Sequence, residues 1–460
     1  MHCCQLECCV QVPIHHETLS GRTALWFQIA SLAMALSLAA PLSFGAARRI
    51  GPGGDAPAAA SAPAASLQVL HWWTSASERR AANLLAARLG DEGVEWQDGA
   101  IPGGAGLGAG KVLRSRVLAG NAPDATQIIG VSIGEWAELG LLLELDGVAA
   151  SGNWNSALFP TIRTLVQHRK HVVAAPLGIH RINTLFYNRK LFARLNLAPP
   201  NNWSEFEQAA RKLRAAGVAP LVQSSEPWQV ATLFENLVLA ESGPEYYREL
   251  FVRQSPQAIA DPRLIEALVH LRSMKGWMLA PLEEQPWTEA VKRFARHEAA
   301  MFVMGDWAKA ELNEMGYATD DEFSCAPMPG TGNYHLYSVD TLAMFAGDYT
   351  HQAVQEKLAR LVVTPAVQQQ YNAAKGAVPV RRDADIQTMD SCARASWRTF
   401  ARGAQWQAPS LVHRMAADEE CRDAIIAEVH RYFIDDGVTP AEAQRRLAGI
   451  LRTLNLRTHK

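Results

Sequence analysis

The chain has 460 residues, 48% of them hydrophobic and 20% charged, which is the composition of a globular protein long enough for two or three domains. Its formal net charge of −2 at pH 7 argues against the basic surface that nucleic-acid binding or electrostatic membrane binding requires. We therefore expect no nucleic-acid partner.

The N-terminal part of the sequence has the pattern of an export signal. An uncharged, mostly apolar run lies between Arg22 and Arg48 and ends in Pro and small residues, which predicts a signal peptide at about residues 22–45. The run is also long enough for an uncleaved membrane anchor. Residues 46–66 are rich in Pro, Ala and Gly and are interpreted as a linker after the extension and signal peptide of residues 1–45.

The cysteines fall into two groups. Four of the seven lie within residues 3–9, followed by His15 and His16. They could form a metal or redox tag, but their position before the signal peptide favours an over-long N-terminus. The others are Cys325, Cys392 and Cys421. In an oxidising compartment two of these three can pair.

After the linker, short apolar strands alternate with amphipathic helices. Strands are predicted at 67–73, 94–99, 125–130 and 171–178, with helices at 78–93 and from 111 to about 121. A later helix has Ser204 as its predicted N-cap, and the last one begins after Thr439 with a capping box. This alternation predicts an α/β fold with mainly parallel sheets, and the length favours two lobes.

Tryptophans beside polar residues are the most informative feature. Trp72 and Trp73 are adjacent at a strand end, where neighbouring side chains point to opposite faces, so one core accommodates both only with difficulty. Similar strings surround Trp228, Trp287 and Trp307. An aromatic plane next to hydrogen-bonding groups suits a neutral polyhydroxyl ligand.

Other motifs are weaker. The Gly-rich loop at 102–110 matches the dinucleotide fingerprint loosely, but it is better interpreted as a surface loop. His168 and His171 have metal-ligand spacing, yet Arg169 and Lys170 between them favour a solvated turn. Spacing alone identifies neither a Ser–His–Asp arrangement nor a glycosidase carboxylate pair.

Ordered strings along the chain resemble those of a known family. They include "LHWWTSASE", "APLGIHRINTLFYN", "MFVMGDWAKAEL", "AAKGAVPVR" and "PSLVHRMA", within a set that runs from residue 67 to about 451. Together they resemble the bacterial extracellular solute-binding proteins of sugar ABC importers (family 1 type), most closely the glucose/mannose-binding subgroup.

The resemblance implies a two-lobed, type II, maltodextrin-binding-like α/β fold. Each lobe would be a mostly parallel sheet flanked by helices, and three hinge crossings would lie near 176–179, 304–306 and 362–365. The first lobe would comprise 67–177 plus 305–363, and the second 178–304 plus 364–460. The ligand would bind in the cleft between them.

The resemblance also implies the ligand-binding residues. They are Trp72, Trp73, Glu78 and Arg114 from the first lobe, Trp228, Trp287 and His413 from the second, Asp306, Trp307 and Lys309 at the returning crossing, and Asp340 and Lys375. In that set Glu78 and Asp306 would accept ligand hydroxyls, whereas Lys309, Lys375 and His413 would donate. It further implies that Cys325 pairs with Cys392.

Three positions depart from the family pattern. Arg114 stands where the family usually has Lys, and the two cations are not equivalent. Pro286 and Thr288 flank Trp287, where the family has Asp and Asn. Thr184 replaces a Trp. The stacking surfaces largely remain while some hydroxyl partners are lost, so a sugar ligand is favoured over glucose in particular.

The function implied is that of a monomeric periplasmic protein that captures a mono- or short oligosaccharide and delivers it to the ABC permease subunits in the inner membrane. Neither a catalytic activity nor a cofactor or metal is expected. The alternatives are a secreted carbohydrate-active enzyme and a binding protein of the same fold for a non-sugar polar solute.

Overall fold

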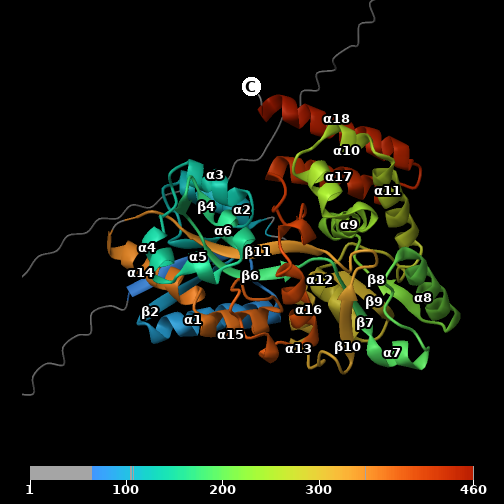
Figure 1. Cartoon of the computed structure of the whole chain (residues 1–460), viewed down its shortest axis with the longest axis horizontal. Coiled ribbons are helices and arrows are strands. Elements are labelled where there is room, and N and C mark those ends of the chain that lie inside the picture. Colours follow the sequence, from blue (N-terminus) through green and yellow to red (C-terminus); the bar gives the residue numbers. More distant parts are fainter. Residues whose placement is uncertain (1–64, 104–105, 107, 348, 459–460) are drawn as a thin grey trace, which may run out of the picture. The chain divides into compact units, whose positions relative to one another are not determined.

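The computed structural model of the chain describes residues 65–103, 106, 108–347 and 349–458 (Figure 1). The predicted extension, the signal peptide and nearly all of the linker lie outside these residues. The predicted linker ends two residues too late, because strand β1 (Ala65–His71) already pairs Ala65 with Val94. Within the described part, no helix has the length and apolarity needed to cross a membrane.

The strands form two main sheets and one small hairpin. The first sheet has six strands, namely β1, β2 (Val94–Ala100), β3 (Ala125–Gln127), β6 (Ala175–Arg181), β11 (His335–Met344) and β12 (Gln407–Pro409). The second has four, namely β7 (Thr184–Asn188), β8 (Ala219–Val222), β9 (Ala299–Met304) and β10 (Phe323–Pro327). The hairpin joins β4 (Gln167–His168) to β5 (His171–Val172).

Both sheets are mixed. In the first, β1 is parallel to β2 and β3, whereas β11 is antiparallel to β3 and β6. In the second, β8 and β9 are parallel, but β7 is antiparallel to both β9 and β10. The expectation of mostly parallel sheets is therefore wrong for the second sheet. A chain that passes repeatedly between two sheets places some of its strands antiparallel, because it does not complete every βαβ unit in one sheet.

Helices flank the first sheet, and together they are called the first lobe here. These helices are α1 (Ala76–Asp91), α2 (Ala109–Leu118), α3 (Ser132–Glu138), α4 (Asp146–Ser151), α5 (Trp154–Ala157), α6 (Pro160–Leu165), α14 (Tyr349–Val362) and α15 (Pro365–Lys375). A capping box begins α1: the Glu78 backbone N–H donates to Ser75 Oγ at 3.4 Å, and the Ser75 backbone N–H donates to Glu78 Oε2 at 3.1 Å.

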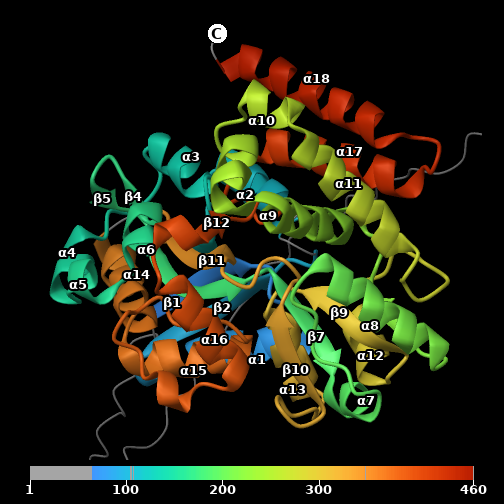
Figure 2. The same cartoon turned by 45° about the vertical axis from the view of Figure 1, so that its right-hand side comes forward.

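The second sheet and its helices are called the second lobe. Its helices are α7 (Arg189–Arg194), α8 (Trp203–Ala215), α9 (Pro227–Phe251), α10 (Pro256–Ala260), α11 (Pro262–Lys275), α12 (Trp287–Ala295), α17 (Glu419–Ile434) and α18 (Pro440–Thr458). The C-terminal helices α17 and α18 lie beside α10 and α11 (Figure 2). Asn202 caps α8, not the predicted Ser204, whereas the predicted cap at Thr439 is confirmed by a 3.2 Å bond from Glu442 N–H.

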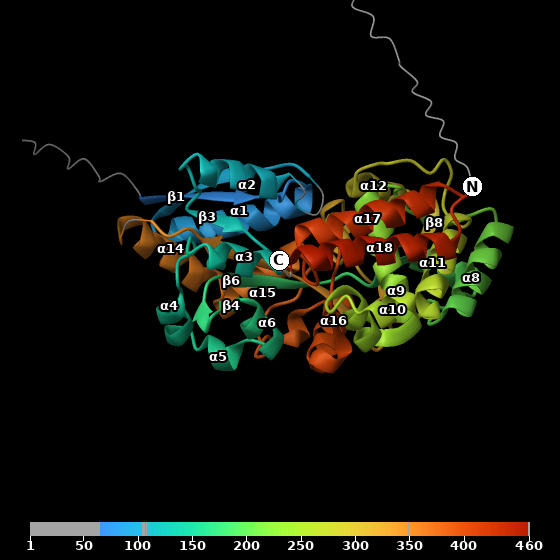
Figure 3. The same ribbon diagram turned by 90° about the horizontal axis from the view of Figure 1, so that it is seen from above.

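The remaining helical segments lie where the lobes join. They are α13 (Trp307–Glu314), α16 (Ser391–Phe400) and the 3₁₀ turns η2 (Ile386–Thr388) and η3 (Ala404–Trp406). Each lobe has its own hydrophobic core, and the helices of the two lobes separate to opposite sides when the molecule is seen from above (Figure 3).

The chain changes sheet at positions that differ from the predicted crossings. It leaves the first sheet between β6 and β7 and returns between β10 and β11. Met304 ends β9, and the next strand, β10, is still in the second sheet. Likewise α15 packs on α1 and β6, so the chain is still in the first lobe after 365. The predicted lobe bounds at 305 and 364 do not coincide with the changes of sheet, because strand pairing and not linear spacing decides which sheet a segment joins.

The predicted disulfide is present. Cys325 on β10 and Cys392 on α16 are joined with an S–S distance of 1.98 Å and a Cα–Cα distance of 5.8 Å. Cys421 is a free thiol buried in the core of the second lobe. The disulfide therefore ties the second sheet to the segment that follows α15.

Candidate functional site

A central cavity of about 410 Å³ lies between the two lobes. It sits at the carboxyl ends of β1, β2 and β3 and at the first turns of α1, α9, α12 and α13, an arrangement typical of ligand sites in α/β folds. Its walls are formed by Trp72, Thr74, Ser75, Glu78, Pro102, Gly103, Ile129, His180, Glu226, Trp228, Pro286, Trp287, Thr288, Trp307, Ser338, Asp340, Lys375 and His413.

Most of the sequence-predicted site residues lie together in this wall. They are Trp72, Glu78, Trp228, Trp287, Trp307, Asp340, Lys375 and His413. The other predicted residues do not line the cavity. They are Trp73, Arg114, Asp306 and Lys309.

The adjacent tryptophans have different environments. Trp72 is half-buried and lines the cavity, and its backbone N–H donates to Gln127 Oε1 at 3.3 Å. Its ring lies so close to Gly106 that a Cβ there would be 3.0 Å away. Trp73 is fully buried, with its ring stacked on His71 at 4.9 Å and tilted against Tyr371 at 6.0 Å. Trp73 is therefore a core residue of the first lobe, and its expected ligand contact is corrected.

Asp306 and Lys309 stand behind the cavity wall. Asp306 accepts bonds from His180 at 2.5 Å and from the Arg181 N–H at 2.8 Å. Lys309 is 2% exposed and donates to Asp390 Oδ2 at 2.6 Å. Both side chains bond to protein groups and do not line the cavity, so the structure does not place them for the direct ligand contacts that were expected. Asp306 instead orients His180, which does line the cavity.

Arg114 lies in a separate side groove. This groove of about 350 Å³ runs along α2 and α3 and shares Trp72 and Ile129 with the central cavity. Arg114 forms an ion pair there with Glu419, at the start of α17 in the second lobe. The guanidinium thus links the lobes instead of facing the central cavity.

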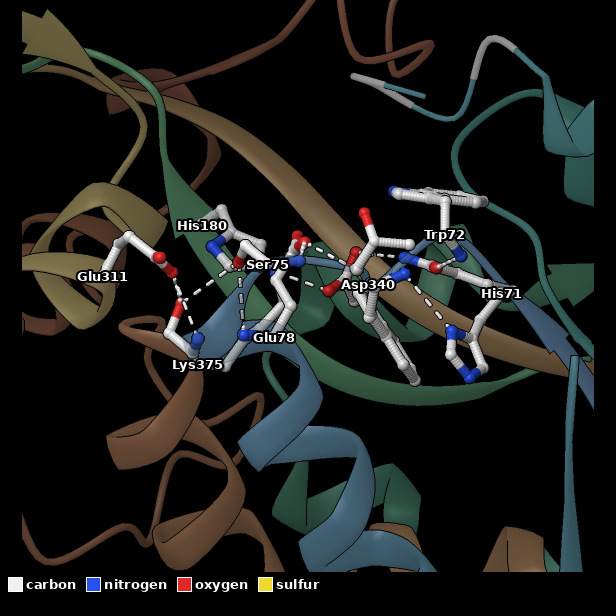
Figure 4. A network of polar contacts seen from close by, with 12 residues as sticks. His71, Trp72, Ser75, Glu78, His180, Glu311, Asp340 and Lys375 are labelled. Carbon is white, nitrogen blue, oxygen red and sulfur yellow. Dashed lines mark hydrogen bonds and ion pairs between the residues drawn. The ribbon is translucent and has the colours of Figure 1, made fainter. Parts of the chain in front are cut away.

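A buried histidine between two carboxylates forms the base of the cavity (Figure 4). The His180 ring contacts Asp306 Oδ1 at 2.5 Å and Asp340 Oδ2 at 3.3 Å. Burial alone lowers the pKa of His180, but the two carboxylates outweigh burial and raise it to about 9. Burial acts to raise the pKa of Asp340, yet the bond and charge of His180 lower it to about 2. At neutral pH both groups are therefore ionised.

A second buried ion pair lies beside this histidine. Lys375, the last residue of α15, donates to Glu78 Oε1 at 3.0 Å. Burial lowers the pKa of Lys375, but the charges of Glu78 and Asp340 overcome this effect and raise it. The other Glu78 oxygen accepts the backbone N–H groups of Thr74 and Ser75 at 3.1 Å each. Glu78 is thus both a helix cap and a cavity carboxylate.

The second lobe contributes aromatic rings with fixed polar neighbours. Trp228 Nε1–H donates to Glu226 Oε2 at 2.9 Å in the first turn of α9. Trp287 is half-buried at the start of α12. The ring centroids of Trp307 and His413 are 5.2 Å apart. These contacts fix the indole rings of Trp228 and Trp307.

Several residues that line the cavity were not predicted from the sequence. His180 and Glu226 are the charged ones, with Ser75, Thr74 and Ser338 among the polar ones. His180 lies in the string "APLGIHRIN", and Glu226 lies two residues before Trp228. The family resemblance that identified the neighbouring residues could therefore have identified both. The role of His180 depends on strand pairing that spacing does not reveal, since β6 meets β11 only in the folded sheet.

The His168 and His171 pair forms a solvated turn, as predicted. His168 contacts Glu138 at 2.9 Å, and Arg169 and Lys170 adopt positive φ between the two strands. His171 contacts Asp146 at 2.7 Å, and that hydrogen bond raises the pKa of His171. Both imidazoles therefore engage surface carboxylates near the hairpin.

Comparison with known proteins places the chain in a family. The family model for bacterial extracellular solute-binding proteins matches residues 75–369. The chain belongs to this family. It is 31% identical over 382 residues to a probable sugar-binding periplasmic protein of Brucella melitensis biotype 1, covering 83% of this chain and 90% of that one. Both descriptions are those of binding proteins.

Solved structures show the same fold. A chitin oligosaccharide binding protein superposes with a TM-score of 0.72 at 18% identity, over 85% of this chain and 99% of that one. A maltose-bound protein, T. maritima MalE3, gives a TM-score of 0.72 at 16% identity, over 85% of this chain and 100% of the other. The expected two-lobed, type II fold is confirmed by these likenesses.

The different environments of Trp72 and Trp73 predict opposite effects of substitution. Trp73→Ala opens a cavity in the first core and should lower the free energy of unfolding by about 3–5 kcal/mol. Trp72→Ala removes a half-buried ring and should lower it by about 1 kcal/mol or less. Urea unfolding in the absence of ligand measures both changes.

Trp96→Ala is a matched control, because Trp96 is also half-buried in the first lobe but does not line the cavity. Equal losses of stability for Trp72→Ala and Trp73→Ala would contradict the assignment of only one ring to the core.

Proposed function

We propose that this protein captures a sugar in the periplasm and delivers it to the permease subunits of an ABC importer. The mono- or short oligosaccharide would bind in the central cavity, and the protein would act as a monomer. Membership of the solute-binding family and the kinship with probable sugar-binding periplasmic proteins support this proposal.

The observation that carries the proposal is the pairing of indole planes with fixed charges in one cavity. Trp72, Trp287 and Trp228 supply aromatic surface from both lobes. The apolar face of a pyranose packs on such a plane, while its hydroxyls require donors and acceptors at the rim.

Those donors and acceptors are already oriented. Asp340 is held by Gln127 at 3.0 Å and by His180, and Glu78 is held by Lys375. A group that is fixed before binding loses little entropy when the ligand arrives. Asp340 and Glu78 retain lone pairs that can accept hydroxyl protons, and Lys375 retains N–H groups that can donate.

The volume supports a small ligand. About 410 Å³ is near the lower end of small-molecule sites, which span roughly 300–1,000 Å³. This favours a monosaccharide or a short oligosaccharide of the glucose or mannose type. Pro286 and Thr288 beside Trp287 offer fewer hydroxyl partners than an acid and an amide would, so related aldoses belong in the same test.

A ligand panel tests the proposal. D-glucose, D-mannose, D-galactose, D-xylose and their β-linked disaccharides should include at least one sugar that raises the melting temperature. A ligand at 100 times its Kd stabilises a protein by about 2.7 kcal/mol. Isothermal titration calorimetry with the same sugars gives the affinity.

Trp72→Ala should abolish the thermal shift, whereas Trp96→Ala should retain it, since Trp96 lies outside the cavity. The panel also includes polyols and short polyamines. A shift with those compounds and none with any sugar would replace the sugar by another polar solute.

A further inference from the structure

Behind His413, a chain of hydrogen bonds leads from the cavity into the core of the second lobe. His413 Nδ1 lies 2.9 Å from Ser410 Oγ, and Ser410 Oγ lies 2.8 Å from Oε1 of Glu235 on α9. Glu235 and Ser410 are both fully buried. His413 lines the cavity, and its Nε2 is buried and has no hydrogen-bond partner among the described residues.

The two oxygens of Glu235 are not equivalent. Oε2 accepts from the Tyr247 hydroxyl at 2.8 Å and from the backbone N–H groups of Leu411 and Val412 at 2.8 and 3.3 Å. Oε1 has the Ser410 hydroxyl as its hydrogen-bond partner. A proton that binds to Glu235 therefore binds to Oε1, where it disturbs fewer donors.

Counting protons gives one arrangement for ionised Glu235. The Ser410 hydroxyl then donates to Oε1, and Ser410 Oγ accepts the His413 backbone N–H at 3.1 Å. Its remaining lone pair accepts a hydrogen bond from His413 Nδ1–H. A neutral imidazole with its proton on Nδ1 has an unprotonated Nε2, which is a hydrogen-bond acceptor for a ligand in the cavity.

Protonated Glu235 reverses the two side-chain bonds, whereas the His413 backbone N–H still donates to Ser410 Oγ. Oε1–H donates to Ser410 Oγ, and the Ser410 hydroxyl turns to donate to His413 Nδ1. The imidazole proton must then be on Nε2, so the cavity receives a donor. Apart from His413 Nε2, which is left for the ligand, the polar atoms of this chain of hydrogen bonds are satisfied in both arrangements, and no heavy atom has to move.

We propose that Glu235 is a positioning residue that sets, through Ser410, whether His413 offers an acceptor or a donor to the ligand. This inference rests on the proposed function for its ligand, but the arrangement of protons exists in the free protein. The acceptor form selects a ligand hydroxyl that can donate, so a deoxy or O-methyl sugar at that position is rejected. The expectation that His413 donates is replaced for ionised Glu235.

The surrounding charges favour Glu235 as the group that changes. His413 faces His180 and Asp340 across the cavity, with Arg414 and Arg422 on its own side. Burial first, then His180 and Arg422, lower the pKa of His413 to about 3, while that of His180 is raised to about 9. Neither histidine titrates between pH 6 and 8.

Glu235 itself faces Tyr247, whose hydroxyl bonds to it, and Tyr337 lies near that hydroxyl. Burial raises the pKa of Glu235 to about 7, against the lowering effect of its hydrogen bonds to Tyr247, Ser410 and the backbone. Ionised Glu235 is therefore lost as the pH falls through about 7, and the acceptor form of His413 is lost with it.

Nitrogen NMR of histidine-labelled, ligand-free protein tests the arrangement directly. The His413 signals, assigned by their absence in His413→Asn, should show the Nδ1–H tautomer at pH 8 and a shift toward Nε2–H at pH 6. Glu235→Gln should show Nε2–H at both pH values. Its carbonyl oxygen can accept the bonds now made to Oε2, and its amide can donate to Ser410.

Binding of the panel sugars gives a second measurement. In the wild-type protein, affinity should fall about three- to tenfold from pH 8 to pH 6, the size expected for one hydrogen bond. Glu235→Gln should have a flat profile at the lower affinity. Glu428→Gln is the matched control, because Glu428 is also buried but pairs with Arg431 at 2.9 Å, outside the cavity.

The inference is overturned if wild-type His413 has Nε2–H at pH 8, or if Glu235→Gln leaves its tautomer unchanged. If Glu235→Gln does not fold, Ser410→Ala interrupts the same series of hydrogen bonds. An unchanged pH dependence of the His413 tautomer in that variant would also overturn the inference. Failure of every sugar to bind would overturn the proposed function, while the NMR result still decides the proton arrangement.

Discussion

The structure depends on one buried cation held between two carboxylates. His180 lies on β6, Asp306 follows β9, and Asp340 lies on β11. Strands β6 and β11 of the first sheet border the two passages between the sheets, and β9 belongs to the second sheet. Each charge is expensive to bury alone, because removal from water costs several kcal/mol per ion. The burial of these three charges is therefore compensated only when all three are present. Their mutual attraction fixes the junction of the lobes at the floor of the cavity.

The same constraint prepares the cavity for polar ligands. Lys375 and Glu78 add a second ion pair, and Gln127 connects Asp340 to the backbone of Trp72. The charged groups of the cavity are thus oriented by hydrogen bonds and ion pairs within the protein (Figure 4). A low local dielectric strengthens each of these contacts. The cavity can then discriminate between ligands by the donors and acceptors that they bring.

Sequence reasoning predicted the fold class, the cap at Thr439, the disulfide and eight of the residues that line the cavity. These features depend on local spacing or on strings that can be compared one by one. It did not predict which of Trp72 and Trp73 enters the core, because the alternation of a strand fixes opposite faces but not their direction. The crossings and the role of His180 were missed for a related reason. The fold brings His180 into contact with Asp306 and Asp340, which lie 126 and 160 positions further along the chain.

The most direct test of the account is a crystal structure of the protein with the tightest-binding sugar of the panel. The account predicts the sugar in the central cavity, with a ring face on Trp72 or Trp287 and a hydroxyl within hydrogen-bond distance of Asp340. A sugar bound elsewhere, with the Asp340 and His180 network facing an empty cavity, would contradict it.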